Sequence, residues 1–226
     1  MKLKIDGLTK RYDDNLVLDD INFEFEDGKI YGLLGRNGAG KTTLMNAINE
    51  DIDYECGSIL LNDEKLNTDD IGYVISTPVV PEFLTAREFL EFFIDIHENE
   101  IEHPHSIEEY FKIVGLDEKD WDKLLKEYSH GMKNKMQILI NIIANPKIIL
   151  MDEPLTSLDV VTQEEMKDLL KNIKKNHIII FSTHILELAL DLCDEIIILN
   201  NKKLTKVDGN KSKNKILDML KDEKND

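Results

Sequence analysis

One eight-residue stretch decides the fold class: Gly35-Arg36-Asn37-Gly38-Ala39-Gly40-Lys41-Thr42. It fits the pattern G-x-x-x-x-G-K-[ST], in which the glycines let backbone N–H groups converge on phosphate oxygens. An apolar segment, Ile30–Leu34, precedes the stretch and a helical pattern, Lys41–Asn49, follows it, which is the strand–loop–helix context that the motif requires. We expect Lys41 to reach the β- and γ-phosphates and the Thr42 hydroxyl to ligate Mg²⁺, with the helix amino terminus favouring the phosphate charge. The stretch therefore predicts a nucleotide site.

Further short apolar runs predict the rest of a sheet, because they are rich in Ile, Val and Leu and almost free of polar residues. Their near-continuous apolar character is typical of parallel strands that are covered on both faces. These runs are Ile71–Ile75, Ile148–Met151, Ile178–Ser182 and Glu195–Leu199. Two early segments, Leu3–Thr9 and Ile21–Glu26, alternate apolar and polar residues, which indicates an antiparallel part with one wet face.

Helical patterns connect the strands, and between Pro81 and Asn145 they follow one another without a strand. This break predicts an α-helical insertion in an α/β core. The predicted helices are Lys41–Asn49, Ala86–His97, Ile107–Val114, Met132–Ala144, Val160–Lys175 and Ile185–Cys193. The predicted fold class is α/β: a P-loop NTPase with a RecA-like parallel sheet core, an antiparallel β subdomain and an inserted α-helical subdomain. We predict a single domain over 1–226, with the core at 1–80 and 146–208, the helical subdomain at 81–145 and a short polar tail at 209–226.

Composition excludes several classes of protein. The 28 Lys and Arg residues against 45 Asp and Glu residues give a formal net charge of −17, which disfavours a general nucleic-acid binder. No run of about 18 uncharged apolar residues exists to cross a membrane. The start of the chain lacks the apolar stretch of a signal peptide, so we expect a cytoplasmic protein. Cys56 and Cys193 are too few for a disulfide framework or a cysteine-rich metal site, and we expect both to be small buried side chains.

A second motif places two carboxylates at the end of a predicted strand. The run Ile148–Met151 leads directly into Asp152-Glu153-Pro154, and ligands of open α/β sheets bind at the carboxyl ends of strands. We expect Asp152 to hold Mg²⁺, directly or through water, and Glu153 to polarise the attacking water beside the γ-phosphate. Taken alone, the pair could be an ordinary polar turn, but the phosphate loop in the same chain favours catalysis.

Three further sequence segments stand in a fixed order with the phosphate loop and the two carboxylates. They are Tyr128-Ser129-His130-Gly131-Met132 before a helix, Leu155-Thr156-Ser157-Leu158-Asp159 after the carboxylates, and Ser182-Thr183-His184 at the end of the next strand. In this order and spacing, together with the phosphate loop and Asp152-Glu153, they resemble the nucleotide-binding subunit of ATP-binding cassette (ABC) transporters over nearly the whole chain. The resemblance implies an ATPase that closes as a head-to-tail dimer. Each ATP would be clamped between the phosphate loop of one protomer and the signature segment, residues 128–132, of its partner.

The resemblance also implies roles for individual residues, with ATP and Mg²⁺ as cofactors. Catalysis would depend on Lys41, Glu153 and His184, with His184 hydrogen-bonded to the γ-phosphate and the attacking water. Tyr12 would stack on adenine, although it could equally pack as core. Ser129 and Asp159 could each be a plain helix N-cap, alone or in addition to a role across the dimer interface. The implied nucleotide-binding residues are Tyr12, Gly35, Arg36, Asn37, Gly38, Ala39, Gly40, Lys41, Thr42, Thr43, Ser129, Gly131 and Asp159.

The chain departs from the family pattern at two places. Ser76 stands where the family usually carries a glutamine that ligates Mg²⁺, and because a serine is shorter, we expect any contact between Ser76 and the metal to run through water. The metal candidates are thus Thr42, Asp152 and, through water, Ser76. In the signature segment, His130 and Met132 replace the commoner glycine and glutamine, whereas the flanking serine and glycine are kept.

The implied partners are a separate transmembrane permease and a second nucleotide-binding subunit, either a second copy or a paralogue, with no nucleic acid. The chain would then lie at the inner face of the cell membrane through the permease. The segment Phe83–Leu90 resembles the face that receives a coupling helix, while we expect Phe89, Leu90, Phe92, Phe93 and Ile96 mainly to form the core of the insertion. The signature resembles those of ABC-2-type exporters of peptides and drugs. The alternative is a soluble ABC ATPase of iron–sulfur assembly.

Overall fold

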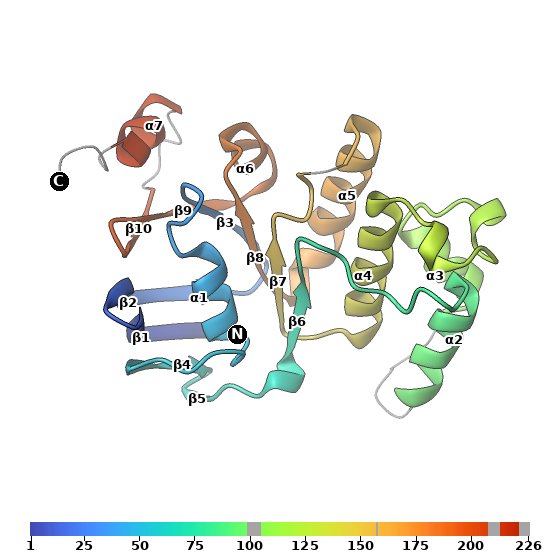
Figure 1. The fold of residues 1–226 in the computed structure, drawn as a ribbon, viewed down its shortest axis with the longest axis horizontal. Helices are drawn as coiled ribbons and strands as arrows, with labels where there is room; N and C mark the ends of the chain where they lie inside the picture. The colour runs from blue at the N-terminus through green and yellow to red at the C-terminus, as the bar shows by residue number, and fades with distance from the viewer. Residues whose placement is uncertain (99–104, 157, 208–212, 222–226) are drawn as a thin grey trace.

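Two sheets form the frame of the protein in the computed structural model, which describes residues 1–98, 105–156, 158–207 and 213–221 (Figure 1). The larger sheet has six strands in the order β10-β9-β3-β8-β7-β6. Its members are β3 (Lys29–Leu34), β6 (Ile71–Val74), β7 (Ile148–Asp152), β8 (Ile178–Thr183), β9 (Glu195–Asn200) and β10 (Lys203–Lys206). All neighbouring strands run parallel except β10, which pairs antiparallel with β9 at one edge. The predicted parallel sheet is confirmed.

A smaller antiparallel sheet of four strands lies beside it, in the order β2-β1-β4-β5. Its strands are β1 (Lys2–Tyr12), β2 (Asn15–Glu26), β4 (Cys56–Leu61) and β5 (Glu64–Lys65). The sequence patterns predicted parts of β1 and β2 but not β4, β5 or β10. β5 and β10 are short and mostly exposed, and β4 begins with two exposed residues and buries only Ile59 and Leu61. β1 and β2 are also longer than predicted, since register shifts interrupt their apolar alternation at Ile5–Leu8 and Leu8–Lys10.

Apolar side chains cover both faces of the six-stranded sheet, as expected for parallel strands. Alternate residues of one strand face opposite cores: Leu150 belongs to the core shared with α1 and the small sheet, and Met151 to the core shared with the other helices. Figure 1 shows α1 beside the small sheet and α2, α3 and α4 gathered on the opposite side of the molecule. The helices are α1 (Lys41–Ile48), α2 (Ala86–Ile96), α3 (Ile107–Ile113), α4 (His130–Ala144), α5 (Val160–Ile173), α6 (Leu186–Leu192) and α7 (Lys213–Lys221).

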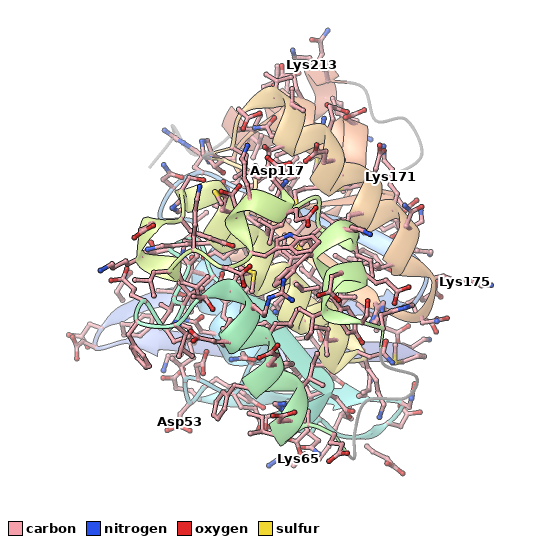
Figure 2. All side chains as sticks on the ribbon, turned by 90° about the vertical axis from the view of Figure 1, so that its right-hand side faces the viewer. Asp53, Lys65, Asp117, Lys171, Lys175 and Lys213 are labelled. Atoms are coloured by element: carbon pink, nitrogen blue, oxygen red, sulfur yellow. The ribbon has the colours of Figure 1, made fainter. Side chains whose placement is uncertain are left out.

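The predicted helical insertion is present between β6 and β7, where it contains α2, α3 and α4, with two short 3₁₀ turns between α3 and α4. Capping boxes begin two of these helices, with Thr85 and Glu88 on α2 and Ser106 and Glu109 on α3. Figure 2 views this side of the molecule, with charged side chains such as Asp117 at its surface. The proposed division of the chain at residues 81, 146 and 209 stays a prediction.

Two expectations about burial were wrong. Cys193 is buried, but Cys56 is exposed at the start of β4, where it pairs with Thr9 of β1 and lies beyond the end of the neighbouring strand β5. Phe92 and Ile96 do not join the core of the insertion, since they lie on the outer side of α2 with 58% and 60% of their surfaces exposed. Leu90 is fully buried and Phe89 and Phe93 are partly buried, as expected.

The tail forms one short helix, α7, whose Ile216 side chain is buried. No helix among the described residues has the length and apolarity needed to span a bilayer.

Gly72 on β6 offers a test of this packing. A Cβ atom there would lie 1.9 Å from Asn141 Oδ1 on α4 and 2.9 Å from Pro146 Cγ. We expect Gly72→Ala to lower the free energy of unfolding by about 1–3 kcal/mol, because overpacking forces neighbouring groups to shift. Urea denaturation measures the change, and a loss below about 0.5 kcal/mol would mean that α4 does not lie this close to β6.

Candidate active site

The phosphate loop connects β3 to α1, and its backbone needs glycine at particular positions. Gly38 and Gly40 adopt φ angles of +83° and +102°, in the region that other residues rarely enter. A Cβ atom on Gly35 would lie 2.8 Å from the Leu199 carbonyl oxygen. Gly40 is the N-cap of α1 and provides no side-chain cap, so the first turn of the helix faces the loop with backbone N–H groups. This arrangement favours an anion at the start of α1.

Lys41 is the first residue of α1 and is only 7% exposed. Its Nζ atom donates hydrogen bonds to the carbonyl oxygens of Gly35 at 2.8 Å and Arg36 at 3.2 Å. Burial lowers the pKa of Lys41, while the nearby carboxylates of Glu153 and Asp152 oppose that shift. An ammonium group that burial penalises gains most from a ligand of strong negative charge, which a polyphosphate supplies.

Asp152 ends β7 with its carboxylate held by two hydroxyl groups. Thr42 Oγ1 donates to Asp152 Oδ2 at 2.8 Å, and Ser182 Oγ donates to Asp152 Oδ1 at 2.5 Å. The Thr42 hydroxyl and the carboxylate are hard oxygen ligands side by side, which suits Mg²⁺. The described residues contain no cluster of three or more His, Cys, Asp or Glu that could hold a metal. The donor set therefore fits a Mg²⁺ ion that arrives with phosphate oxygens, as Mg²⁺ commonly does.

Glu153 occupies the centre of the site. Its backbone has a φ angle of +51°, and its N–H group lies 3.3 Å from Ser182 O and 3.1 Å from Ser182 Oγ. Its carboxylate accepts a hydrogen bond from Thr156 Oγ1 at 2.7 Å and lies 2.8 Å from His184 Nδ1. The Nζ atom of Lys41 is 3.9 Å from the same carboxylate. The three predicted catalytic residues therefore lie together, because Lys41 and His184 are each within 4 Å of the Glu153 carboxylate.

A cavity of about 420 Å³ opens over these groups. Tyr12 lies at its rim with 45% of its surface exposed, so the alternative that Tyr12 packs as core is wrong. The volume lies within the range of small-molecule sites. The cavity is lined by Tyr12, Val17, Asn37, Gly38, Gly40, Lys41, Thr42, Thr43, Ser76, Asp152 and Glu153.

The remaining predicted residues lie outside this cavity. Gly35, Arg36 and His184 line a neighbouring hollow of about 370 Å³, together with Leu34, with Leu220 from α7 and with Asn37, which also lines the first cavity. Ala39 lines a third, smaller hollow of about 220 Å³.

The signature segment and the segment after Glu153-Pro154 do not line the cavity of their own chain. Ser129 caps α4, where its Oγ accepts a hydrogen bond from Met132 N at 3.2 Å, and Asp159 caps α5 through Val161 N and Thr162 N at 3.1 Å. Both N-cap alternatives are therefore present in the structure. Ser157 lies outside the described residues. One chain alone does not bring its signature segment to its phosphate loop.

Sequence reasoning missed several supporting residues of the site. Val17 lines the cavity beside Tyr12, Ser182 contacts both carboxylate residues and Thr156 contacts Glu153. One signal pointed to Ser182, because it is the polar residue that ends the strand after Asp152, and the two residues are paired across β7 and β8. No sequence pattern distinguished Val17 from an ordinary strand residue.

Comparison with known proteins agrees with this geometry. The family model described as ABC transporter matches residues 18–156. The chain belongs to the ABC transporter family. ABC transporter ATP-binding proteins are ATPases, and this ABC ATPase binds and hydrolyses ATP.

Relatives cover most of this ABC ATPase. An ABC transporter ATP-binding protein of Methanocaldococcus jannaschii is 34% identical over 204 residues, or 89% of this chain and 75% of the relative. The bacitracin transport ATP-binding protein of Bacillus licheniformis is 33% identical over 89% of this chain and 68% of its own length. An Fe(3+) ions import ATP-binding protein of Fusobacterium nucleatum is 27% identical over 90% of this chain and 57% of its own length. A solved ATP-binding subunit of an ABC transporter superposes with a TM-score of 0.78 at 27% identity, covering 92% of this chain and 91% of that structure.

Ser76 offers a test of the metal assignment in this ABC ATPase. It lines the cavity but is exposed on the loop after β6, whereas Thr42 is hydrogen-bonded to Asp152. We expect Ser76→Ala to keep basal ATPase activity within a few-fold and to leave the Mg²⁺ concentration for half-maximal activity unchanged, since a serine contact through water is replaceable by water. Thr42→Val is the contrasting variant, which keeps the shape and should raise that concentration at least tenfold. A hundredfold loss in Ser76→Ala would instead identify Ser76 as a direct metal ligand.

Proposed function

We propose that this chain is the ATP-hydrolysing subunit that drives a separate membrane permease, with hydrolysis in the cavity between the phosphate loop and Asp152-Glu153. The observation that carries the proposal is the position of the Glu153 carboxylate, 2.8 Å from His184 Nδ1 and 3.9 Å from Lys41 Nζ. A carboxylate next to the start of α1 stands where the γ-phosphate of a bound ATP and its attacking water would meet. Asp152 and Thr42 would hold Mg²⁺, which would neutralise phosphate charge when bound.

Each group of the site has its own role in ATP hydrolysis. The loop N–H groups and Lys41 bind the phosphates and stabilise the charge that develops on them. Glu153 orients the attacking water and accepts its proton as the oxygen attacks phosphorus and the bond to the β-phosphate breaks. His184 donates a hydrogen bond toward the γ-phosphate, and its contact with Glu153 keeps the two side chains together. Tyr12 stacks on the adenine ring at the rim of the cavity.

The second half of the site comes from another nucleotide-binding subunit, which we propose to be a second copy of this chain or a paralogue. Ser129 is exposed at the amino end of α4 and lies outside the cavity of its own chain. In a head-to-tail dimer, the hydroxyl of Ser129 and the N–H group of Gly131 would reach the γ-phosphate bound by the partner, and the helix terminus would add favourable charge. Asp159 would reach across the same interface while capping α5.

Glu153→Gln tests the catalytic assignment. The substitution keeps the shape of the side chain but removes the proton acceptor, so we expect turnover to fall by about 10²- to 10⁴-fold. ATP binding should persist, and light scattering should detect an ATP-dependent dimer that the wild-type chain forms only transiently. Lys41→Ala is the contrasting variant, because it should weaken ATP binding itself. Near wild-type turnover in Glu153→Gln would exclude Glu153 as the base and leave His184 as the principal candidate.

We propose that the permease docks in an apolar groove on the helical side of the molecule. The groove has a volume of about 490 Å³ and is lined by Pro81, Phe83, Leu84, Glu88, Phe89 and Phe92. Phe83 is 79% exposed, and large apolar side chains exposed together are typical of interaction surfaces. A helix of the permease with an apolar face suits such a groove.

The signature segment and one relative bear on the cargo and the direction of transport. We propose export of a peptide- or drug-like compound, on the strength of the signature segment and the similarity to the bacitracin transport protein. In this arrangement the chain lies at the cytoplasmic face of the membrane through its permease. Transport of labelled peptide into or out of vesicles that contain the reconstituted complex tests the direction, and ATP-driven accumulation in right-side-out vesicles would show import instead.

Phe83→Asp tests the groove. A buried carboxylate facing an apolar partner is costly, so we expect at least a tenfold loss of co-purified multi-span membrane protein from detergent-solubilised membranes. The basal ATPase activity of the isolated chain should not change, because Phe83 lies outside the active-site cavity. Ile96→Asp is the matched control, since Ile96 is exposed on the same helical side but does not line the groove. Equal losses in both variants would place the permease elsewhere.

A further inference from the structure

Helix α4 contains two buried amide oxygens, Asn134 Oδ1 and Gln137 Oε1, that have no hydrogen-bond partner among the residues that the structure describes. An unpaired buried acceptor destabilises the folded state, and an apolar side chain of similar size would avoid that cost. Asn134 is only 1% exposed, yet its other amide atom makes a bond: Nδ2 donates to the Pro154 carbonyl oxygen at 3.0 Å. Of these two amides, Asn134 is thus the one that contacts the turn containing Glu153.

The Glu153-Pro154 turn has a strained backbone that contacts with neighbouring elements must stabilise. Glu153 has a φ angle of +51°, a conformation that costs a non-glycine residue free energy and persists only where its surroundings fix it. Its N–H group faces Ser182 on β8. The next residue is a proline with no N–H group, so the backbone there can be held only through its carbonyl group. Asn134 supplies the donor for that carbonyl, and the turn is therefore fixed by β8 on one side and by α4 on the other.

The first turn of α4 carries the signature residues. Ser129 is its N-cap, and Asn134 follows Gly131 by three residues, which is less than one turn of helix. A Cβ atom on Gly131 would lie 3.0 Å from Leu158 Cδ2, so the start of α4 also touches the segment after Glu153.

We propose that Asn134 is a positioning residue for ATP hydrolysis: its amide ties the Glu153-Pro154 turn, and with it the Glu153 carboxylate, to the helix that begins with Ser129 and Gly131. This inference rests on the proposed role of Glu153 as the base. It explains why α4 keeps a buried amide with an unpaired oxygen at this place. A shift of α4 moves the donor that fixes the turn, so the signature segment of a chain and its own catalytic carboxylate move together.

The test compares Asn134→Leu with Gln137→Leu, which removes the other unpaired amide from the same helix. Gln137→Leu should melt at or above the wild-type temperature, because it removes an unpaired buried oxygen. Asn134→Leu removes such an oxygen too but leaves the Pro154 carbonyl without its donor, so it should melt close to the wild-type temperature. We expect Asn134→Leu to lower kcat at least tenfold with KM for ATP unchanged, since a small displacement of a catalytic group is costly and the phosphate-binding groups are untouched. Gln137→Leu should keep kcat within twofold. If Asn134→Leu does not fold, Asn134→Ala removes the same donor without needing extra room.

A double-mutant cycle with Glu153→Gln shows whether Asn134 acts through the carboxylate. In single-turnover measurements, Asn134→Leu should slow the Glu153→Gln protein less than twofold. An equal slowing in both backgrounds, or a kcat of Asn134→Leu within twofold of wild type, would overturn the inference while leaving the role of Glu153 intact. Wild-type turnover in Glu153→Gln alone would refute the proposed base and the inference with it.

Discussion

The register between β7 and β8 is the constraint on which the site depends. Asp152 pairs with Ser182, and Leu34 at the end of β3 pairs with Thr183 at the end of β8. The three parallel strands therefore end at one edge, where the phosphate loop, the two carboxylates and His184 can meet. A slip of one residue would turn Asp152 to the opposite face of the sheet and separate it from Thr42. The apolar strand residues, which are buried on both faces, make such a slip costly.

The parts of this arrangement that sequence could predict are those with a regular pattern. The apolar runs gave the parallel strands because buried strands carry few polar residues, and the spacing of glycines and lysine gave the phosphate loop. The patterns could not give β5 or β10, whose exposed side chains resemble those of loops. Nor could they give the contacts of Asn134 with Pro154 or of Thr156 with Glu153, which depend on how elements distant in sequence pack. The exposure of Phe92 and Ile96 was missed for a related reason, since a large apolar residue on a helix is ordinarily core.

The electrostatics of the site contrast with those of the whole chain. The formal net charge is −17, but the phosphate loop gathers backbone N–H groups and Lys41 at one place. An anionic ligand must approach an acidic protein, so local donors rather than long-range attraction bind it. The proposed Mg²⁺ would offset the repulsion between the carboxylates at the edge of the cavity and the phosphates of ATP.

The two cysteines differ in a way that has a practical consequence. Cys193 lies beneath Gly32 in the core, where a Cβ atom on the glycine would come within 2.8 Å of its sulfur, whereas Cys56 stands exposed at the start of β4. A thiol reagent that reacts with accessible sulfur will therefore modify one position of the unaltered chain. A maleimide fluorophore at Cys56 would report from the small sheet beside α1, with no cysteine substitution required.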